Sequence, residues 1–240
     1  GRSPHAMRLS ERARQIAMLS QRPDFNFPFK IEEIIALGRY PFRGDKVSVD
    51  DLVWQIIEAL ELEPLVGRSI LTLSGGERQR VHIARAIAQV WEWREPGWLL
   101  LDEPFSALDP LIRREMQDEF LRLQEILGKT IVFITHDFDE ALRLADRIAI
   151  MKDGAIEQCD TPDQIVLHPA TEYVRKFTEE IDKARVVHAE VLIEPGLVGT
   201  GDPVSAGATV QNLARGLIND QRDVIPVIQQ GKIIGAFKRQ

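Results

Sequence analysis

Apolar residues recur at helical spacing in two long segments of the chain. Residues 75–91 carry one buried face, and residues 110–127 carry another. The second segment also has clear ends, because Asp109 is a candidate N-cap, Pro110 suits the first helical position and Gly128 follows the last apolar residue. The pattern predicts two amphipathic helices. Their expected buried positions are Val81, Ala84, Ile87 and Ala88 in the first, and Ile112, Met116, Phe120, Leu123 and Leu127 in the second.

Two short segments, residues 98–101 (WLLL) and 130–134 (TIVFI), are apolar without alternation. Such runs are typical of strands that are buried on both faces of a parallel sheet. Because a predicted helix lies between them with short connections, we expect a β-α-β unit and an α/β fold with a mainly parallel sheet. Residues 147–151 end at a Lys-Asp-Gly turn, which predicts a further strand and a hairpin.

The pattern changes after about Val186. Gly and Pro cluster between residues 195 and 207, a helix-like stretch covers 209–218, and the apolar runs VIPVI and IIGAF are joined by QQGK. We therefore expect a first domain over residues 1–185. A small α+β tail with the order β-α-β-β would cover residues 186–240.

Composition narrows the class of protein. The chain has 240 residues, of which 44% are hydrophobic and 28% are charged, as in globular proteins. The net charge of −7 gives no reason to expect nucleic acid as a partner. Cys159 is the only cysteine, which excludes an internal disulfide framework. No apolar run approaches the ~20 residues of a membrane span, so a role at a membrane would be that of a peripheral subunit.

Polar residues follow both predicted buried strands. Asp102 and Glu103 come after the first strand, and His136 comes shortly after the second. Ligands bind beyond the carboxyl ends of parallel strands, so these side chains point to one site. A carboxylate there can hold Mg²⁺ against phosphate oxygens, and a neighbouring Glu can deprotonate an attacking water. Taken alone, the Asp-Glu-Pro sequence also fits a simple turn of the chain.

The segment LSGGERQR poses a question of energetic cost. Ser74 and Glu77 fit a capping box that starts the helix over residues 75–91. Gly75 and Gly76, however, occupy its first turn, and a glycine inside a helix costs roughly 1 kcal/mol against alanine. Helix N-termini bind phosphate through free N–H groups, and glycine lets the backbone approach a ligand closely. The alternative is a capped helix with a loose first turn.

Four motifs in this order, LSGGERQR, WLLLDEP, SALD and ITHD, closely resemble the ATP-binding cassette (ABC) ATPases over roughly residues 10–180. The resemblance implies a P-loop NTPase-like cassette with a parallel sheet and a helical subdomain at about residues 22–90. It also implies an enzyme that hydrolyses ATP with the help of Mg²⁺.

The resemblance assigns roles to single residues. Asp102 would support Mg²⁺, and Gln21 would contact both Mg²⁺ and the attacking water. Glu103 would be the general base, and His136 would contact the γ-phosphate.

The same resemblance implies partners. The chain would form a homodimer with ATP sandwiched between two copies. An integral membrane permease would hold it at the cytoplasmic face of the membrane and link it indirectly to a substrate-binding protein. Several aromatic residues follow residue 21 in the region that grips a permease helix in ABC importers: Phe25, Phe27, Phe29, Tyr40 and Phe42. ATP bound by the second copy would be contacted by the LSGG segment and by the SALD loop that crosses the interface, and the residues assigned to this binding are Ser74, Gly75, Gly76, Glu77 and Asp109.

The P-loop pattern G-x-x-x-x-G-K-S/T is absent from the sequence. Gly128-Lys129-Thr130 matches only its end, because Leu123 replaces the first glycine and the triplet leads into a predicted strand. In the family this loop precedes the segment that contains Gln21, so here it would precede Gly1. We expect a chain that lacks the first strands of its sheet, exposes apolar surface and is inactive alone.

The sequence gives two signals for the cargo. Residues up to about 103, including PFKIEEIIALGRYPF, resemble haem or iron-chelate import ATPases. The remainder resembles glycine betaine/proline importers, and DVIPVIQQGKIIGAF is similar to half of a CBS (cystathionine β-synthase-type) module. Chain length and this tail favour a quaternary amine. The alternatives are a haem or iron-chelate importer, an ABC ATPase of DNA repair or the ribosome, and a nucleotide-silent interaction module.

Overall fold

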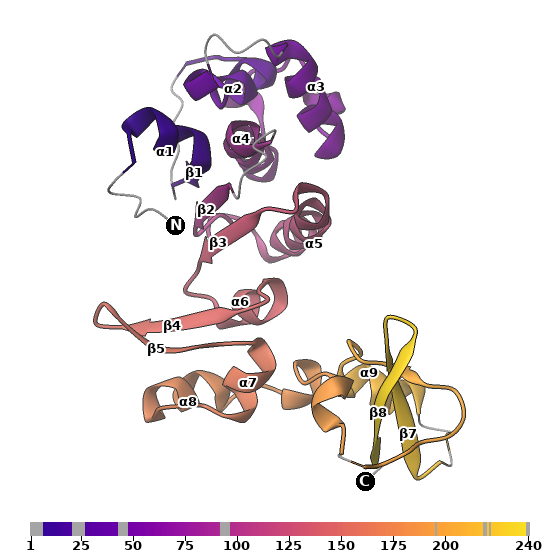
Figure 1. Cartoon of the computed structure of the whole chain (residues 1–240). Helices are drawn as coiled ribbons and strands as arrows, with labels where there is room; N and C mark the ends of the chain where they lie inside the picture. The colour runs from indigo at the N-terminus through magenta and orange to yellow at the C-terminus, as the bar shows by residue number, and fades with distance from the viewer. Residues whose placement is uncertain are drawn as a thin grey trace. The chain divides into compact units, whose positions relative to one another are not determined.

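The structure is a computed structural model that describes residues 7–20, 27–42, 48–91, 97–194, 196–217, 220 and 222–238. Contacts within the chain divide it into two units, Gly1–His136 and Asp137–Gln240. Figure 1 shows the elements of both units. The domain boundary predicted at residue 185 lies inside the second unit and stays a prediction.

The first unit contains a parallel sheet in the order β1-β2-β3, formed by β1 (Ile16–Leu19), β2 (Trp98–Asp102) and β3 (Thr130–Ile134). α5 (Pro110–Leu127) connects β2 to β3, so the predicted β-α-β unit is confirmed. The ring of Phe133 on β3 lies 5.6 Å from that of Phe105 and 6.1 Å from that of Phe120 on α5. These contacts attach α5 to one face of the sheet.

Within the described part of the chain, the opposite face of the sheet is exposed. Met18, Leu100 and Val132 are register partners across the three strands, and Met18 is 54% and Val132 38% exposed. Trp98 and Ile134 are also exposed. The prediction that β2 and β3 are buried on both faces is therefore wrong for this face, because no element in the described ranges covers it.

Helices in the first unit surround the long helix α4 (Gly75–Val90), whose predicted apolar face is fully buried. A Cβ atom on Gly38, which follows α2, would lie 2.1 Å from the carbonyl oxygen of Arg85 on α4. α2 and α4 therefore pack backbone against backbone. The other elements are α1 (Leu9–Gln15), α2 (Ile31–Leu37), η2 (Tyr40–Phe42), α3 (Val49–Ala59), η3 (Glu63–Leu65) and η4 (Ile70–Thr72).

The second unit begins with α6 (Phe138–Leu144) and an antiparallel hairpin of β4 (Ile148–Lys152) and β5 (Ala155–Asp160). Asp153 and Gly154 form its turn with positive φ angles, as the Lys-Asp-Gly sequence predicts. α7 (Pro162–Leu167) and α8 (Glu172–Thr178) follow. Their shared core consists of Ile148, Ile150, Ile165 and Val174.

The tail has a separate core. β6 (Val204–Ser205) pairs in parallel with β7 (Val224–Gln229), which pairs in antiparallel with β8 (Lys232–Lys238). α9 (Val210–Gly216) lies between β6 and β7 in sequence, so the predicted β-α-β-β order is confirmed. Two short 3-10 helices, η5 (Lys183–Arg185) and η6 (Ala189–Leu192), precede β6 in the sequence. The core residues are Ala189, Ala206, Leu213, Ile225, Val227 and Phe237.

In the part of the chain that the structure describes, no helix combines the length and the apolar character needed to cross a bilayer.

Candidate nucleotide site

Glu103 and His136 meet at the carboxyl ends of β2 and β3. Nδ1 of His136 lies 2.9 Å from Oε1 of Glu103. The backbone N–H of Glu103 also donates to the carbonyl oxygen of Ile134, at 2.9 Å. The loop after β2 is thus fastened to the end of β3 through both its backbone and its side chain. The structure thus brings together two of the three side chains that the sequence placed at this edge.

Glu103 has an unusual backbone conformation. Its φ angle is +45°, a region that non-glycine residues seldom adopt and that clusters at functional sites. Its carbonyl oxygen accepts hydrogen bonds from the hydroxyl of Ser106 at 3.0 Å and from the N–H of Ser106 at 3.2 Å. The Glu103 side chain is 24% exposed and that of His136 is 74% exposed. The carboxylate is therefore sheltered, while the imidazole borders on solvent.

Asp102 is the last residue of β2 and is half-buried beside Glu103. In the described ranges, no three His, Cys, Asp or Glu side chains gather as a metal cluster would require. Mg²⁺ usually binds through one or two carboxylates and completes its shell with phosphates and waters. A single carboxylate at Asp102 fits that pattern. Gln21, the other predicted Mg²⁺ contact, lies outside the described residues.

Ser74 and Glu77 form the predicted capping box at the start of α4. The hydroxyl oxygen of Ser74 accepts from the N–H of Glu77 at 3.3 Å. Oε2 of Glu77 accepts from the N–H and from the hydroxyl of Ser74, both at 2.7 Å. These hydrogen bonds lower the pKa of Glu77, and the nearby charges of Arg68 and Arg80 lower it further. Glu77 therefore accepts these capping hydrogen bonds as an ionised carboxylate.

The two glycines of the LSGG segment have different surroundings. A Cβ atom on Gly75 would meet nothing within 4 Å, whereas one on Gly76 would lie 2.7 Å from Cγ2 of Ile112 on α5. The open space at Gly75 suits close approach of a ligand. At Gly76, packing against α5 already requires glycine. Sequence reasoning placed Ile112 on a buried helix face but gave no signal of this contact.

Asp109 caps α5 as predicted. Its Oδ1 accepts from the N–H groups of Leu111 at 3.1 Å and of Ile112 at 3.2 Å. At the other end Gly128 is left-handed, with φ 53° and ψ 31°, and its N–H donates to the carbonyl oxygen of Gln124 at 3.0 Å. The Gly-Lys-Thr triplet is therefore a helix end that leads into β3, as the sequence predicts.

Comparison with known proteins gives sequence relatives. The family described as ABC transporter matches residues 1–106. The trimethylamine N-oxide transport system ATP-binding protein TmoW of Ruegeria pomeroyi is 70% identical over 187 residues, which are 77% of this chain and 54% of that protein. The glycine betaine transport ATP-binding protein OpuAA of Bacillus subtilis is 56% identical over 181 residues, 74% of this chain and 41% of that protein. The chain thus spans about half the length of these relatives.

Solved structures support the cassette fold. An ABC transporter of the metal-chelate type in an inward-facing conformation matches with a TM-score of 0.56 and 26% identity, over 65% of this chain and 61% of that one. CbiO1 of Clostridium perfringens, part of the ABC transporter complex cbiONQ, matches with a TM-score of 0.57 and 25% identity, over 71% of this chain and 66% of that one.

Proposed function

Because this chain contains an ATPase domain of the ABC transporter family, we propose that it serves in an ATP-hydrolysing subunit that powers uptake of a small solute through a separate permease. The observation that carries the proposal is the Glu103–His136 pair beside Asp102, at the carboxyl ends of parallel strands. This is the edge where α/β sheets bind ligands.

The geometry suggests how the residues divide the chemistry. Glu103 accepts the proton of the water that attacks the γ-phosphate, because its carboxylate is sheltered and held in one orientation. The Nδ1–H of His136 would donate a hydrogen bond to that carboxylate, and the imidazole borders on solvent, where it can contact the γ-phosphate. Asp102 would hold Mg²⁺, which neutralises charge on the phosphate oxygens when it is bound.

A second copy of the chain would complete the site. Ser74 and Gly75 are exposed at the N-terminus of α4, where N–H groups and the helix dipole favour an anion. Asp109, at the N-terminus of α5, is exposed as well. We propose that these residues and Gly76 contact ATP held by the other copy. Glu77 supports them through the capping box.

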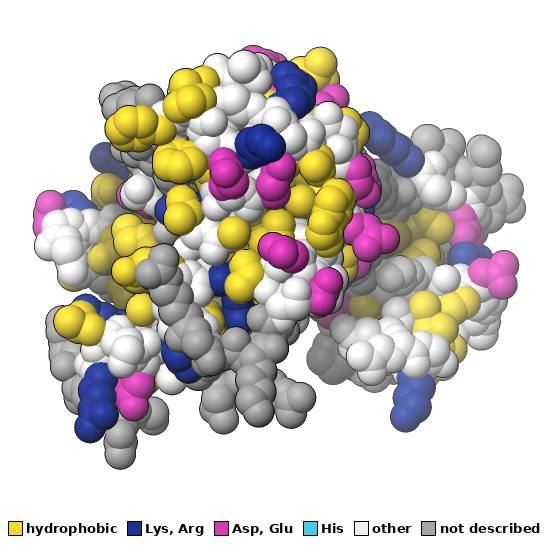
Figure 2. Space-filling model, turned by 90° about the horizontal axis from the view of Figure 1, so that it is seen from above, with side chains coloured by type: hydrophobic (Ala, Val, Ile, Leu, Met, Phe, Trp, Pro, Cys, Tyr) yellow, Lys and Arg dark blue, Asp and Glu magenta, His cyan; other side chains and the backbone are white. Residues whose placement is uncertain are grey.

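The permease would contact the helical part of the first unit. Phe27 and Phe29 pack edge to face with ring centroids 6.2 Å apart, and both are exposed, as is Tyr40. Figure 2 shows the molecule from the side of α2 and α3, where apolar side chains are spread among acidic ones. Phe42 differs, because its half-buried ring lies near the guanidinium groups of Arg14 and Arg39 and so has a structural role. Phe25 lies outside the described residues.

For the cargo we propose a quaternary amine or an amine oxide. The named relatives serve transport of trimethylamine N-oxide and glycine betaine. The tail over residues 186–240 would be a CBS-like regulatory element, and its β-α-β-β order and separate core support this role.

Uptake into vesicles that hold the assembled transporter tests these proposals together. We expect ATP-dependent uptake of labelled trimethylamine N-oxide or glycine betaine, and none of haem. Haem uptake would instead favour the iron-chelate alternative. Assembly without any ATP-dependent uptake would favour the nucleotide-silent interaction module.

A further inference from the structure

The N-termini of α4 and α5 touch at one tight point. A Cβ atom on Gly76 would lie 2.7 Å from Cγ2 of Ile112, closer than Cβ atoms approach other heavy atoms in folded proteins. Any larger residue at position 76 would therefore push the two helices apart or displace Ile112. The contact joins the first turn of α4 to the first turn of α5, which Asp109 caps.

Ile112 has little freedom to move. Its β-branched side chain has one strongly preferred χ1 rotamer in a helix. Its N–H is held by the carboxylate of Asp109 at 3.2 Å, and the carbonyl oxygen of Asp109 accepts from the N–H of Arg113 at 2.8 Å. The Asp109 cap thus fixes the backbone that carries the Cγ2 atom. The position of Asp109 and the approach of Gly76 are linked through one side chain.

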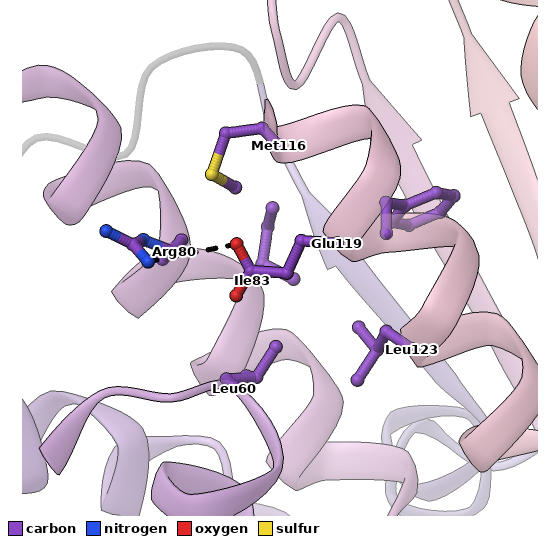
Figure 3. A pocket seen from close by; sticks show the side chains of 7 residues that line it. Leu60, Arg80, Ile83, Met116, Glu119 and Leu123 are labelled. Atoms are coloured by element: carbon purple, nitrogen blue, oxygen red, sulfur yellow. Dashed lines mark ion pairs between the residues drawn. The ribbon is translucent and has the colours of Figure 1, made fainter. Parts of the chain in front are cut away.

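The next turn of the same helix interface is packed less tightly. Nη1 of Arg80 lies 3.8 Å from Oε2 of Glu119, at the edge of a small pocket between α4, α5 and the end of α3 (Figure 3). Nε of Arg80 and Oε1 of Glu119 are buried and have no hydrogen-bond partner. A long, incompletely bonded ion pair beside a pocket constrains the spacing of the two helices less strictly than the contact between Gly76 and Ile112 does.

We propose that Ile112 is a positioning residue for the segment Ser74–Gly76. Through Gly76 it sets how closely the N-terminus of α4 approaches the Asp109 loop, so that both present one continuous surface. That this surface contacts ATP rests on the proposed function. The contact between Gly76 and Ile112 is independent of it. The two glycines then have separate roles: Gly75 leaves room for a ligand and Gly76 leaves room for Ile112.

Opposite effects of two neighbouring substitutions test the proposal. Gly75→Ala should keep or raise the melting temperature of the chain, because alanine favours helix and its Cβ meets open space. Gly76→Ala should lower the melting temperature by about 2–10 °C, as overpacking does. Adding Ile112→Leu should restore it, since leucine keeps the side-chain volume but lacks the Cγ2 branch. If Gly76→Ala does not fold, recovery of folding in the double variant Gly76→Ala with Ile112→Leu supports the proposal equally.

A distance measurement separates positioning from mere stability. Spin labels on Arg78→Cys and Leu111→Cys, both exposed positions, report the spacing of the two helix starts after Cys159→Ser removes the native thiol. Electron paramagnetic resonance should show a longer or broader distance in Gly76→Ala. The distance should return to that of the parent chain with Ile112→Leu, while Gly75→Ala should leave it unchanged.

The outcomes distinguish the inference from the proposed function. The role of Ile112 is overturned if Gly76→Ala behaves like Gly75→Ala. It is also overturned if Ile112→Leu restores neither the melting temperature nor the distance in Gly76→Ala. Failure of the proposed function would instead show as an absence of any MgATP effect on the assembled transporter, with the rescue by Ile112→Leu intact.

Discussion

Nδ1 of His136 and Oε1 of Glu103 lie 2.9 Å apart, although the residues are 33 positions apart in sequence. The contact joins the loops that follow β2 and β3, and it holds the carboxylate that we propose as the general base. Either side chain should therefore depend on the other for its effect on hydrolysis.

Glu103→Gln should leave ATP binding intact and reduce hydrolysis by about 10²-fold or more, because the amide cannot accept the proton of the attacking water. Phosphate release by the assembled transporter measures the effect. Glu125→Gln on the exposed side of α5 is the matched control and should hydrolyse ATP normally. Near-normal turnover of Glu103→Gln would remove Glu103 from the role of base.

His136→Ala should also reduce turnover, since Glu103 loses the hydrogen bond that orients it. If the two residues act as a unit, the double variant with Glu103→Gln should be hardly slower than Glu103→Gln alone. Rates of the two single variants and the double variant give this comparison. Fully additive effects would mean that the two side chains act separately.

His82 on α4 should make the fold sensitive to acid. Burial, together with the nearby charges of Arg85 and Arg78, lowers the pKa of His82 from its ordinary 6.5 to about 4. Between pH 6.5 and pH 4, His82 is therefore protonated in the unfolded chain but neutral in the folded chain. The free energy of unfolding falls as the pH falls through this range. At about 1.4 kcal/mol per pKa unit, the loss is on the order of 3 kcal/mol.

Urea unfolding of His82→Leu between pH 7 and pH 4 measures this loss. The variant should show a flatter dependence of unfolding free energy on pH than the parent chain. His168→Gln, at an exposed position, should keep the parent slope. Equal slopes for His82→Leu and the parent chain would contradict the assignment.

Asp163 on α7 should attach the tail to the helices before it. Its buried carboxylate accepts from the N–H of His188 at 2.8 Å and contacts Nδ1 of His188 at 3.0 and 3.1 Å. Asp163→Ala leaves that N–H without its acceptor, at a cost of about 1–3 kcal/mol. Hydrogen exchange around residues 187–190 should speed up, whereas Glu180→Ala at an exposed site should not change it. Unchanged exchange in Asp163→Ala would show that other contacts hold the tail.

The open face of the sheet should promote self-association. Val132→Thr with Ile134→Thr removes apolar surface from this face and keeps β-branched residues in the strand. Light scattering of the purified chain should fall, with little change in melting temperature. Ile131→Thr on the other face is the control and should destabilise the chain. Unchanged scattering in the double variant would place the association elsewhere.

Much of the fold follows from local signals in the sequence. Asp109, Pro110 and Gly128 predict the ends of α5 correctly because capping and left-handed glycine depend on the chain nearby. The β-α-β unit follows from two apolar runs on either side of that helix. The exposure of one sheet face could not be predicted, because TIVFI is as apolar as a strand with both faces covered. Its exposure depends on what packs against it.

The candidate site also has a part that the sequence predicts and a part that it does not. Asp102, Glu103 and His136 were found because the ends of parallel strands meet at one edge. The contact of Gly76 with Ile112 was missed, since it joins two helices whose spacing no local pattern encodes. The positive φ of Glu103 was also unforeseen, because glutamate gives no sequence signal for a left-handed conformation.

Phosphate release from MgATP tests whether Asp102, Glu103 and His136 form an ATP-hydrolysing site. The assay compares the purified 240-residue chain, the same chain extended at its N-terminus by a P-loop segment of an ABC ATPase, and the extended chain with Glu103→Gln. We expect turnover only in the extended chain, and its loss with Glu103→Gln. An extended chain without turnover, or turnover that survives Glu103→Gln, would contradict the claim that these residues form an ATP-hydrolysing site.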